Sequence, residues 1–304
     1  MGKLKFQGGI TKLFSSKIGE LNKKKFTDFI GQDISAIVKS ISVTKVLVSI
    51  VSFSSRNDFP EQVLSILSFL RYSGVPSSWT IYSDGSHTAN QKQLLVSIFA
   101  FVVLEERKLD HLEKIPGAFK NSLNRYKPFL LDYAKSRPLG KKLLYYLNHE
   151  VISPTLFIDS DILFYQKSFV LNCILKENFD GWYLPDAGWG SLDSRYKQKN
   201  SEQLYQVNSG LFLLNKNIAV LEAGLDFLES LESNYEYFSE QTVMHILFRA
   251  NGFYPLDPRL FVLNISDQFD FSYAYDRESI AVRHYTGPVR HKMWQKDWKW
   301  HLSL

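Results

Sequence analysis

Two aspartates, Asp159 and Asp161, lie one residue apart inside an apolar run. Residues 156–158 lead into the pair and residues 162–165 lead out of it, which is the pattern of a buried strand broken at its centre by a turn. Two carboxylates so close to a core are costly unless a cation or several hydrogen bonds compensate. We predict that the pair binds Mn²⁺ or Mg²⁺, which would also hold phosphate oxygens. The alternative is a strand-end turn with both aspartates in water.

A basic turn near the end of the chain is a candidate phosphate site. Gly287 would let the backbone approach a phosphate closely, and Arg290 and Lys292 follow it. Their cationic groups could neutralise a departing diphosphate. The alternative is a solvated basic loop.

Polar residues in two apolar segments are candidates for sugar binding. Asn208 and Ser209 interrupt an apolar strand, where an amide and a hydroxyl need partners. Sugar hydroxyls would serve, and a backbone bulge is the alternative. Glu240 and Gln241 open a helix, where an acid either stabilises the helix dipole or binds the donor sugar near its reacting carbon.

The elements that would position these residues alternate between strands and helices. Strands are expected over 45–53 and 79–85, and a helix lies between them over 60–72. This alternation predicts an α/β protein with a mostly parallel, Rossmann-like sheet and helices on both faces. Asp84 and the aspartate pair would both lie at carboxyl ends of strands, where a nucleotide binds.

The second half of the chain begins with an expected loop over 181–190, rich in glycine and tryptophan. Trp182 and Trp189 either form a platform for an acceptor or pack in the core. The loop also carries Asp186, a candidate base. We expect a basic lead-in over 1–44, one catalytic domain over 45–295 and a basic, aromatic tail over 296–304.

The cysteine content and the distribution of charge limit the cellular compartment and the partners that we expect for the protein. The single cysteine of the 304 residues, Cys173, permits no internal disulfide and fits a buried apolar position in a cytoplasmic protein. Lysines crowd both termini, and at the C-terminus they alternate with Trp294, Trp298 and Trp300. That mixture predicts peripheral contact with an anionic membrane, or else a solvated tail with partly buried indoles. No nucleic-acid-binding pattern accompanies the charge, so nucleic acid is not an expected partner.

Together these residues resemble the GT-A glycosyltransferases, and more narrowly the retaining enzymes of glycosyltransferase family 8. The resemblance covers roughly residues 45–295 and rests on four patterns in the family's order, which are Asp159-Ser160-Asp161, Asn208-Ser209-Gly210, Glu240-Gln241, and His284-Tyr285-Thr286-Gly287 ahead of Lys292-Met293-Trp294. The chain departs from the family in having Glu-Gln for Asp-Gln and Lys-Met-Trp for Lys-Pro-Trp. Its lysine also lies farther from the histidine than usual, which makes Arg290 a second candidate for the role of Lys292.

The resemblance implies a role for each matched residue. Asp159 would contact ribose and metal, and Asp161 and His284 would complete the protein ligands of the metal. The imidazole of His284 makes Mn²⁺ a better fit than Mg²⁺. The resemblance also implies donor-binding residues, which are Asn208, Glu240 and Gln241 around the sugar, and Gly287 and Lys292 at the diphosphate.

The predicted function is metal-dependent transfer of a hexose from a nucleotide-diphosphate donor, a UDP-sugar, to a hydroxyl of a glycan, a lipid-linked molecule or a small molecule, with retention. Under retention the leaving phosphate would take the acceptor proton while Gln241 steadies the sugar cation. Under inversion Asp186 would act as base. A sugar nucleotidyltransferase would need a glycine-rich loop after the first strand, where residues 54–58 contain no glycine. A non-catalytic nucleotide-sugar or glycan-binding protein is the other alternative.

Overall fold

The strands of the protein form two sheets of different size. The computed structural model describes residues 2–31, 34–41, 44–114, 119–186, 191–197, 205–269, 271, 273 and 275–302. Its strands are β1 (Ser49–Ser54), β2 (Ser78–Ser83), β3 (Val102–Glu105), β4 (Thr155–Asp159), β5 (Ile162–Phe164), β6 (Gly181–Asp186), β7 (Gln206–Leu214), β8 (Tyr254–Pro255), β9 (Phe261–Val262) and β10 (Val282–His284). Its helices are α1 (Gly2–Ile30), α2 (Ile34–Ser40), α3 (Phe59–Tyr72), α4 (Ala89–Ile98), α5 (Leu109–Lys114), α6 (Lys127–Ser136), α7 (Pro138–Asn148), α8 (Leu171–Ile174), α9 (Ser194–Lys197), α10 (Glu222–Glu229), α11 (Ser239–Ala250), α12 (Arg290–Lys292) and α13 (Trp298–Leu302).

The larger sheet has seven strands in the order β3-β2-β1-β4-β7-β6-β8. Strands β3, β2, β1 and β4 are parallel, whereas β7 runs antiparallel to both β4 and β6. This arrangement confirms the predicted α/β class with a mostly parallel central sheet.

The expected loop over 181–190 is wrong for its first six residues, which form β6. Strand β8 pairs only with Trp182 and Tyr183. Pro185 therefore lies where β6 has become an edge strand, and an edge tolerates a residue without an N–H.

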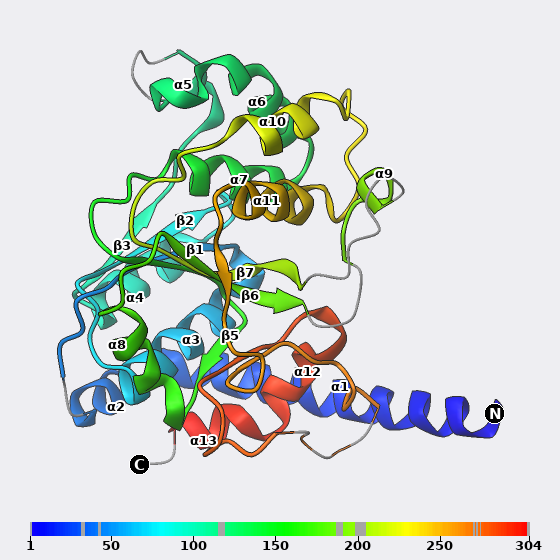
Figure 1. Ribbon diagram of the computed structural model, residues 1–304. Helices are drawn as coiled ribbons and strands as arrows, with labels where there is room; N and C mark the ends of the chain where they lie inside the picture. The colour runs from blue at the N-terminus through cyan, green and yellow to red at the C-terminus, as the bar shows by residue number, and fades with distance from the viewer. Residues whose placement is uncertain are drawn as a thin grey trace.

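Helices cover both faces of this sheet (Figure 1). Alternate residues of a strand point to opposite faces, so Leu156 and Ile158 pack toward α3, whereas Phe157 packs toward α7 and α11. Each face of β4 is thus buried, as the near-continuous apolar run before Asp159 predicts.

The smaller sheet has the order β5-β10-β9. The chain passes from the large sheet to the small one through Asp159, Ser160 and Asp161, which lie at the end of β4 and in the turn before β5. Strand β10 runs antiparallel to β5 and places His284 opposite Ile162. The backbone N–H of Tyr285 donates to the carbonyl oxygen of Asp161 over 2.9 Å. This pairing brings residues more than a hundred positions apart to the same point.

The two ends of the chain pack together. The ring of Phe26 in α1 lies 5.3 Å from the indole of Trp294 and 6.1 Å from that of Trp298, between ring centroids. Both indoles are buried and Trp300 is partly buried, so the expectation that Trp294 and Trp298 face a membrane is wrong. The alternative of a solvated tail is wrong for these two residues as well. No helix in the described ranges is both long enough and apolar enough to cross a bilayer.

Cys173 is exposed, contrary to the expectation of a buried side chain. It lies in the single turn of α8, in which Leu171 is buried and Ile174 packs against the core. Residues three apart share a helix face, so Cys173, which lies between these two in the sequence, points away from the core.

Candidate active site

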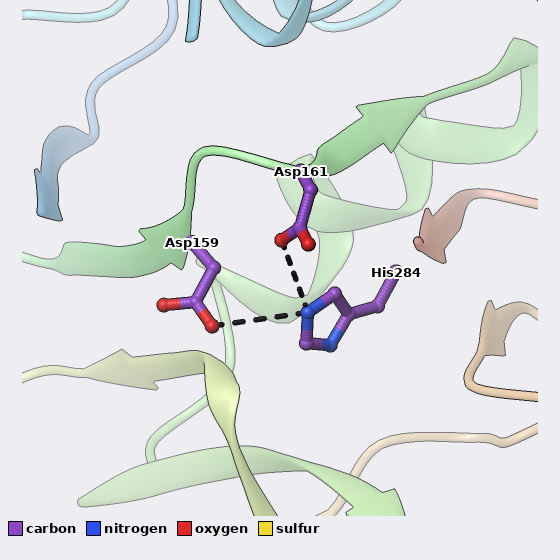
Figure 2. A group of neighbouring side chains, drawn as sticks. All are labelled: Asp159, Asp161 and His284. Atoms are coloured by element: carbon purple, nitrogen blue, oxygen red, sulfur yellow. Dashed lines mark ion pairs between the residues drawn. The ribbon is translucent and has the colours of Figure 1, made fainter. Parts of the chain in front are cut away.

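Two carboxylates and an imidazole converge where the two sheets meet (Figure 2). The Nε2 atom of His284 lies 3.2 Å from an Oδ1 oxygen of Asp161 and 3.8 Å from an Oδ2 oxygen of Asp159. One ligand atom from each residue can be chosen so that all lie within 4.8 Å of one another. Two oxygens and one imidazole nitrogen form a donor set that suits Mn²⁺.

Asn208 fixes which nitrogen of His284 faces the carboxylates. Its Oδ1 accepts a hydrogen bond from the backbone N–H of Gly210 over 3.0 Å, which identifies this atom as the amide oxygen. The same oxygen lies 2.9 Å from Nδ1 of His284, so Nδ1 is the donor there. In the neutral ring the lone pair of Nε2 then faces two carboxylates. A cation between them fits this orientation, because a metal-bound histidine usually donates its other N–H to an oxygen.

Gly210 leaves the space that the imidazole occupies. A Cβ atom at this position would lie 2.2 Å from Cε1 of His284 and 2.7 Å from its Nδ1. Both distances are below any real contact of a Cβ atom. A glycine in the centre of a buried strand is otherwise unfavourable, and here the close approach of another side chain accounts for it.

Arg290 holds the second oxygen of Asp161. Its Nη2 atom donates to Oδ2 of Asp161 over 2.6 Å, and Nη1 lies 3.3 Å from Oδ1 of Asp58. Burial alone would raise the pKa of Asp161, but the positive charge and hydrogen bonds of Arg290 oppose this rise, and that pKa lies well below its usual range. Asp161 is thus ionised in the core at neutral pH, as a metal ligand must be.

Lys142 in α7 connects the metal cluster to α11. Its buried ammonium lies 2.7 Å from Oδ1 of Asp159 and 3.6 Å from Oε1 of Glu240. Burial lowers the pKa of Lys142, but Asp159 and Glu240 raise it by more, so the lysine stays charged. Burial raises the pKa of Glu240 by more than Lys142 lowers it. Nothing in the sequence distinguishes Lys142 from the other basic residues that precede β4.

The polar residues of β7 contact those that open α11. Ser209 donates to Oε2 of Glu240 over 2.8 Å, and the Nδ2 group of Asn208 donates to Oε1 of Gln241 over 3.1 Å. The Nε2 group of Gln241 donates in turn to the carbonyl oxygen of Ser191 over 2.7 Å. A register shift between Tyr183 and Leu184 of β6 faces this part of β7. The bulge considered for Asn208 and Ser209 therefore exists, and both side chains also line the cavity described next.

These residues line one cavity of about 450 Å³. It contains ten of the predicted site residues, which are Asp159, Asp161, Asp186, Asn208, Ser209, Glu240, Gln241, His284, Gly287 and Arg290. Among the described lining residues, four are carboxylates and two, Lys142 and Arg290, are permanent cations. Full ionisation leaves an excess of two negative charges, which one divalent cation neutralises.

Three predicted residues lie elsewhere. Asp84 caps its own turn, accepting from the backbone N–H of Ser86 over 2.8 Å, and it does not line the cavity. The fully buried ammonium of Lys292 lies over the ring of Tyr273, 4.8 Å from its centroid. Trp182 packs against Tyr254 with ring centroids 5.5 Å apart, away from the cavity. Trp189 lies outside the described residues.

The fold is similar to that of solved glycosyltransferases. The galactosyltransferase LgtC, crystallised in complex with donor and acceptor sugar analogues, matches with a TM-score of 0.51 and 14% identity over 83% of this chain and 99% of that chain. The bifunctional glycosyltransferase WbbM in its apo form matches with a TM-score of 0.52 and 17% identity over 81% of this chain. The matched region spans about half of WbbM, 47% of its chain. Comparisons with protein-family models and with curated proteins found no match. The chain therefore has the GT-A fold.

Proposed function

We propose that the protein is a metal-dependent glycosyltransferase that moves a hexose from a nucleotide-diphosphate sugar, a UDP-sugar, to a hydroxyl acceptor with retention of configuration. The observation that carries the proposal is the histidine whose Nε2 lone pair is turned by Asn208 toward two carboxylates. It lies in a cavity of about 450 Å³ within a GT-A fold. The uridine base rests on the sequence resemblance alone.

The protein would hold the diphosphate between the metal cluster and the turn at Gly287. A Mn²⁺ ion bound by Asp159, Asp161 and His284 would supply electrophilic stabilisation of the leaving diphosphate. Arg290 lines the same cavity and keeps a permanent positive charge beside Asp161. We assign to Arg290 the diphosphate contact first considered for Lys292, because the Lys292 ammonium lies over Tyr273.

The donor sugar would lie against Asn208, Ser209, Glu240 and Gln241. The Oε1 oxygen of Glu240 lies 3.6 Å from the ammonium of Lys142 and accepts no shorter hydrogen bond from the described residues, so a sugar hydroxyl could become a second partner. Among the described residues, the Oε1 oxygen of Gln241 accepts one hydrogen bond, from Asn208, and its second lone pair can face positive charge on the reacting carbon. With retention the leaving phosphate takes the acceptor proton on the same face, and Asp186 need not act as a base.

The acceptor would bind at the rim of the cavity. Tyr237 is 77% exposed and lines the cavity together with Phe238 and Leu263. Aromatic and aliphatic surface beside carboxylates suits a sugar ring, which has apolar faces and polar edges. The glycan, lipid or small molecule to which this ring belongs would be identified by an acceptor panel.

The first test is a thermal-shift screen of UDP, GDP, CDP and dTDP, each with and without Mn²⁺. A nucleotide present at about 100 times its dissociation constant adds about 2.7 kcal/mol to the free energy of unfolding. We expect stabilisation by UDP that requires Mn²⁺ and that disappears in Asp161→Asn. Asp267→Asn is the matched control, because Asp267 is a buried carboxylate paired with Arg283 over 2.8 Å and does not line the cavity.

Two outcomes would sink the proposal. If Asp161→Asn keeps the full metal-dependent stabilisation, the carboxylate is not a metal ligand. If wild type binds UDP and Mn²⁺ tightly but neither hydrolyses UDP-hexoses nor transfers sugar across the panel, the protein is a nucleotide-sugar-binding protein instead. Proton NMR of the anomeric centre of a fresh product then decides between retention and inversion.

A further inference from the structure

The N-terminal helix α1 turns apolar side chains toward solvent. Leu13, Phe14 and Leu21 are 65%, 61% and 63% exposed, and Ile10 and Ile18 are exposed as well. At 3.6 residues per turn these five residues fall on one face of the helix. In Figure 1 the N-terminal end of α1, in blue, projects beyond the rest of the fold.

Between Ser15 and Asn22 the opposite face of α1, which packs on the protein, is small and polar, whereas Phe26 farther along the same face is buried against Trp294. Ser15 is buried and bonded to the side chain of Gln295, and Asn22 donates to the carbonyl oxygen of Trp294 over 2.9 Å. A Cβ atom on Gly19 would lie 3.1 Å from the carbonyl oxygen of His291. Surface helices normally bury their apolar face, so this part of α1 has the reverse orientation. The exposed apolar residues of α1 do not contribute to the core, so their clustering on one face needs another explanation.

The exposed apolar face also carries positive charge. Lys17, Lys24 and Lys25 lie on it, are exposed, and form no ion pair with any described residue. Its acids are Asp28 on the face and Glu20 at its edge. We propose that this face of α1, residues 10–25, docks on a bilayer surface that contains anionic phospholipids. Apolar side chains would enter the boundary between headgroups and acyl chains, and the lysines would meet anionic headgroups.

Charge favours a bilayer over a second copy of the chain as the occupant of this face. Packing the same face of two copies together would oppose two surfaces with an excess of positive charge, which is unfavourable. An anionic bilayer presents the complementary charge to all three lysines at once. The inference is independent of the proposed reaction, because none of these residues lines the cavity.

The test is flotation of the full chain with phosphatidylcholine vesicles, with and without phosphatidylserine. We expect binding to the vesicles with phosphatidylserine, lowered more than tenfold in Leu13→Ser/Phe14→Ser/Leu21→Ser. Lys17→Gln/Lys24→Gln/Lys25→Gln should lower it by a similar factor and remove its dependence on phosphatidylserine. The matched control is Leu47→Ser/Ile152→Ser, which removes side chains that are 84% and 89% exposed outside α1 and should leave binding unchanged.

The folded state of each variant is checked by its melting temperature, which should stay near that of wild type because the changed side chains are exposed. No binding to phosphatidylserine vesicles would overturn the proposal. Equal loss in the control variant would do the same, since it would show that any exposed apolar side chain suffices. Sedimentation that reveals a dimer which the α1 variant abolishes would reassign the face to a second copy of the chain.

Discussion

Gly210→Ala should displace the His284 side chain from the metal cluster, although none of the three ligand residues is itself substituted. The new Cβ atom would lie 2.2 Å from Cε1 of His284, which is 1.2 Å short of ordinary contact at 3.4 Å. The ring cannot stay where it is, and Oδ1 of Asn208, to which Nδ1 of the ring is bonded, would itself lie only 2.7 Å from the same Cβ atom. Metal–ligand distances tolerate about 0.2 Å. A shift of the ring by more than 1 Å therefore takes Nε2 out of the site.

The expected effect is a loss of about 100-fold in Mn²⁺ affinity, or about 2.8 kcal/mol. Calorimetric titration of Mn²⁺ into the apo protein measures it directly. Gly181→Ala is the matched control, because its Cβ atom would lie 2.6 Å from the ring of Phe253, in the same sheet but outside the cavity. That variant should lose stability and keep its affinity for Mn²⁺.

A double variant separates the clash from general damage. If the imidazole is what the new methyl group strikes, Gly210→Ala should cost much less stability in a His284→Ala background than in wild type, since the ring is gone. Equal costs in the two backgrounds would refute this account of Gly210. So would a folded Gly210→Ala protein that binds Mn²⁺ as tightly as wild type.

Three further predictions follow from buried polar groups. Lys142→Met should lower the free energy of unfolding by about 3 kcal/mol at pH 8. The loss should be smaller at pH 5, because burial raises the pKa of Glu240 and this carboxylate can take up a proton at the lower pH. Urea unfolding at both pH values measures the loss, and a loss independent of pH contradicts the prediction. Asn208→Ala should lower Mn²⁺ affinity by about 10- to 100-fold by releasing Nδ1 of His284, and unchanged calorimetric affinity would exclude that role. Burial, with Arg71 and Arg277, lowers the pKa of His301 to about 3, so the native state binds fewer protons than the unfolded chain below pH 6.5 and loses stability as the pH falls. His301→Phe should reduce the slope of the free energy of unfolding against pH by up to about 1.4 kcal/mol per pH unit between about pH 6 and pH 4, as measured by urea unfolding. An unchanged slope would show that another group is responsible.

The turn between β4 and β5 was predictable because burial leaves a clear pattern in the residues around it, although the two halves of the expected strand belong to different sheets. Apolar residues on both sides of Asp159 and Asp161 mark a strand covered on two faces, and the two acids mark its interruption. Pro128 and Pro138 lie in the first turns of α6 and α7, where proline is tolerated.

Other features depend on contacts between distant residues. Glycine, tryptophan and proline in β6 have the composition of a loop, and only pairing with β7 makes them a strand. Arg290 and Lys292 are both basic and two residues apart, so sequence cannot decide which one turns toward Asp161 and which toward Tyr273. Lys142 gives no local signal, because its partners Asp159 and Glu240 come from a strand and a helix elsewhere in the chain.

The junction between the two sheets has a mechanical consequence. Asp159 ends a strand of the large sheet, whereas His284 belongs to the small one, and Asp161 lies in the turn that joins them. A cation bound by all three residues would cross-link the two sheets, so the sheets could separate only if the cation were released. Local unfolding at the edge of one sheet would then be coupled to local unfolding at the edge of the other. When Mn²⁺ is added, amide exchange in β5 and β10 should therefore slow together with exchange at the end of β4. Rigidity of the whole junction would thus depend on the occupancy of one small ion.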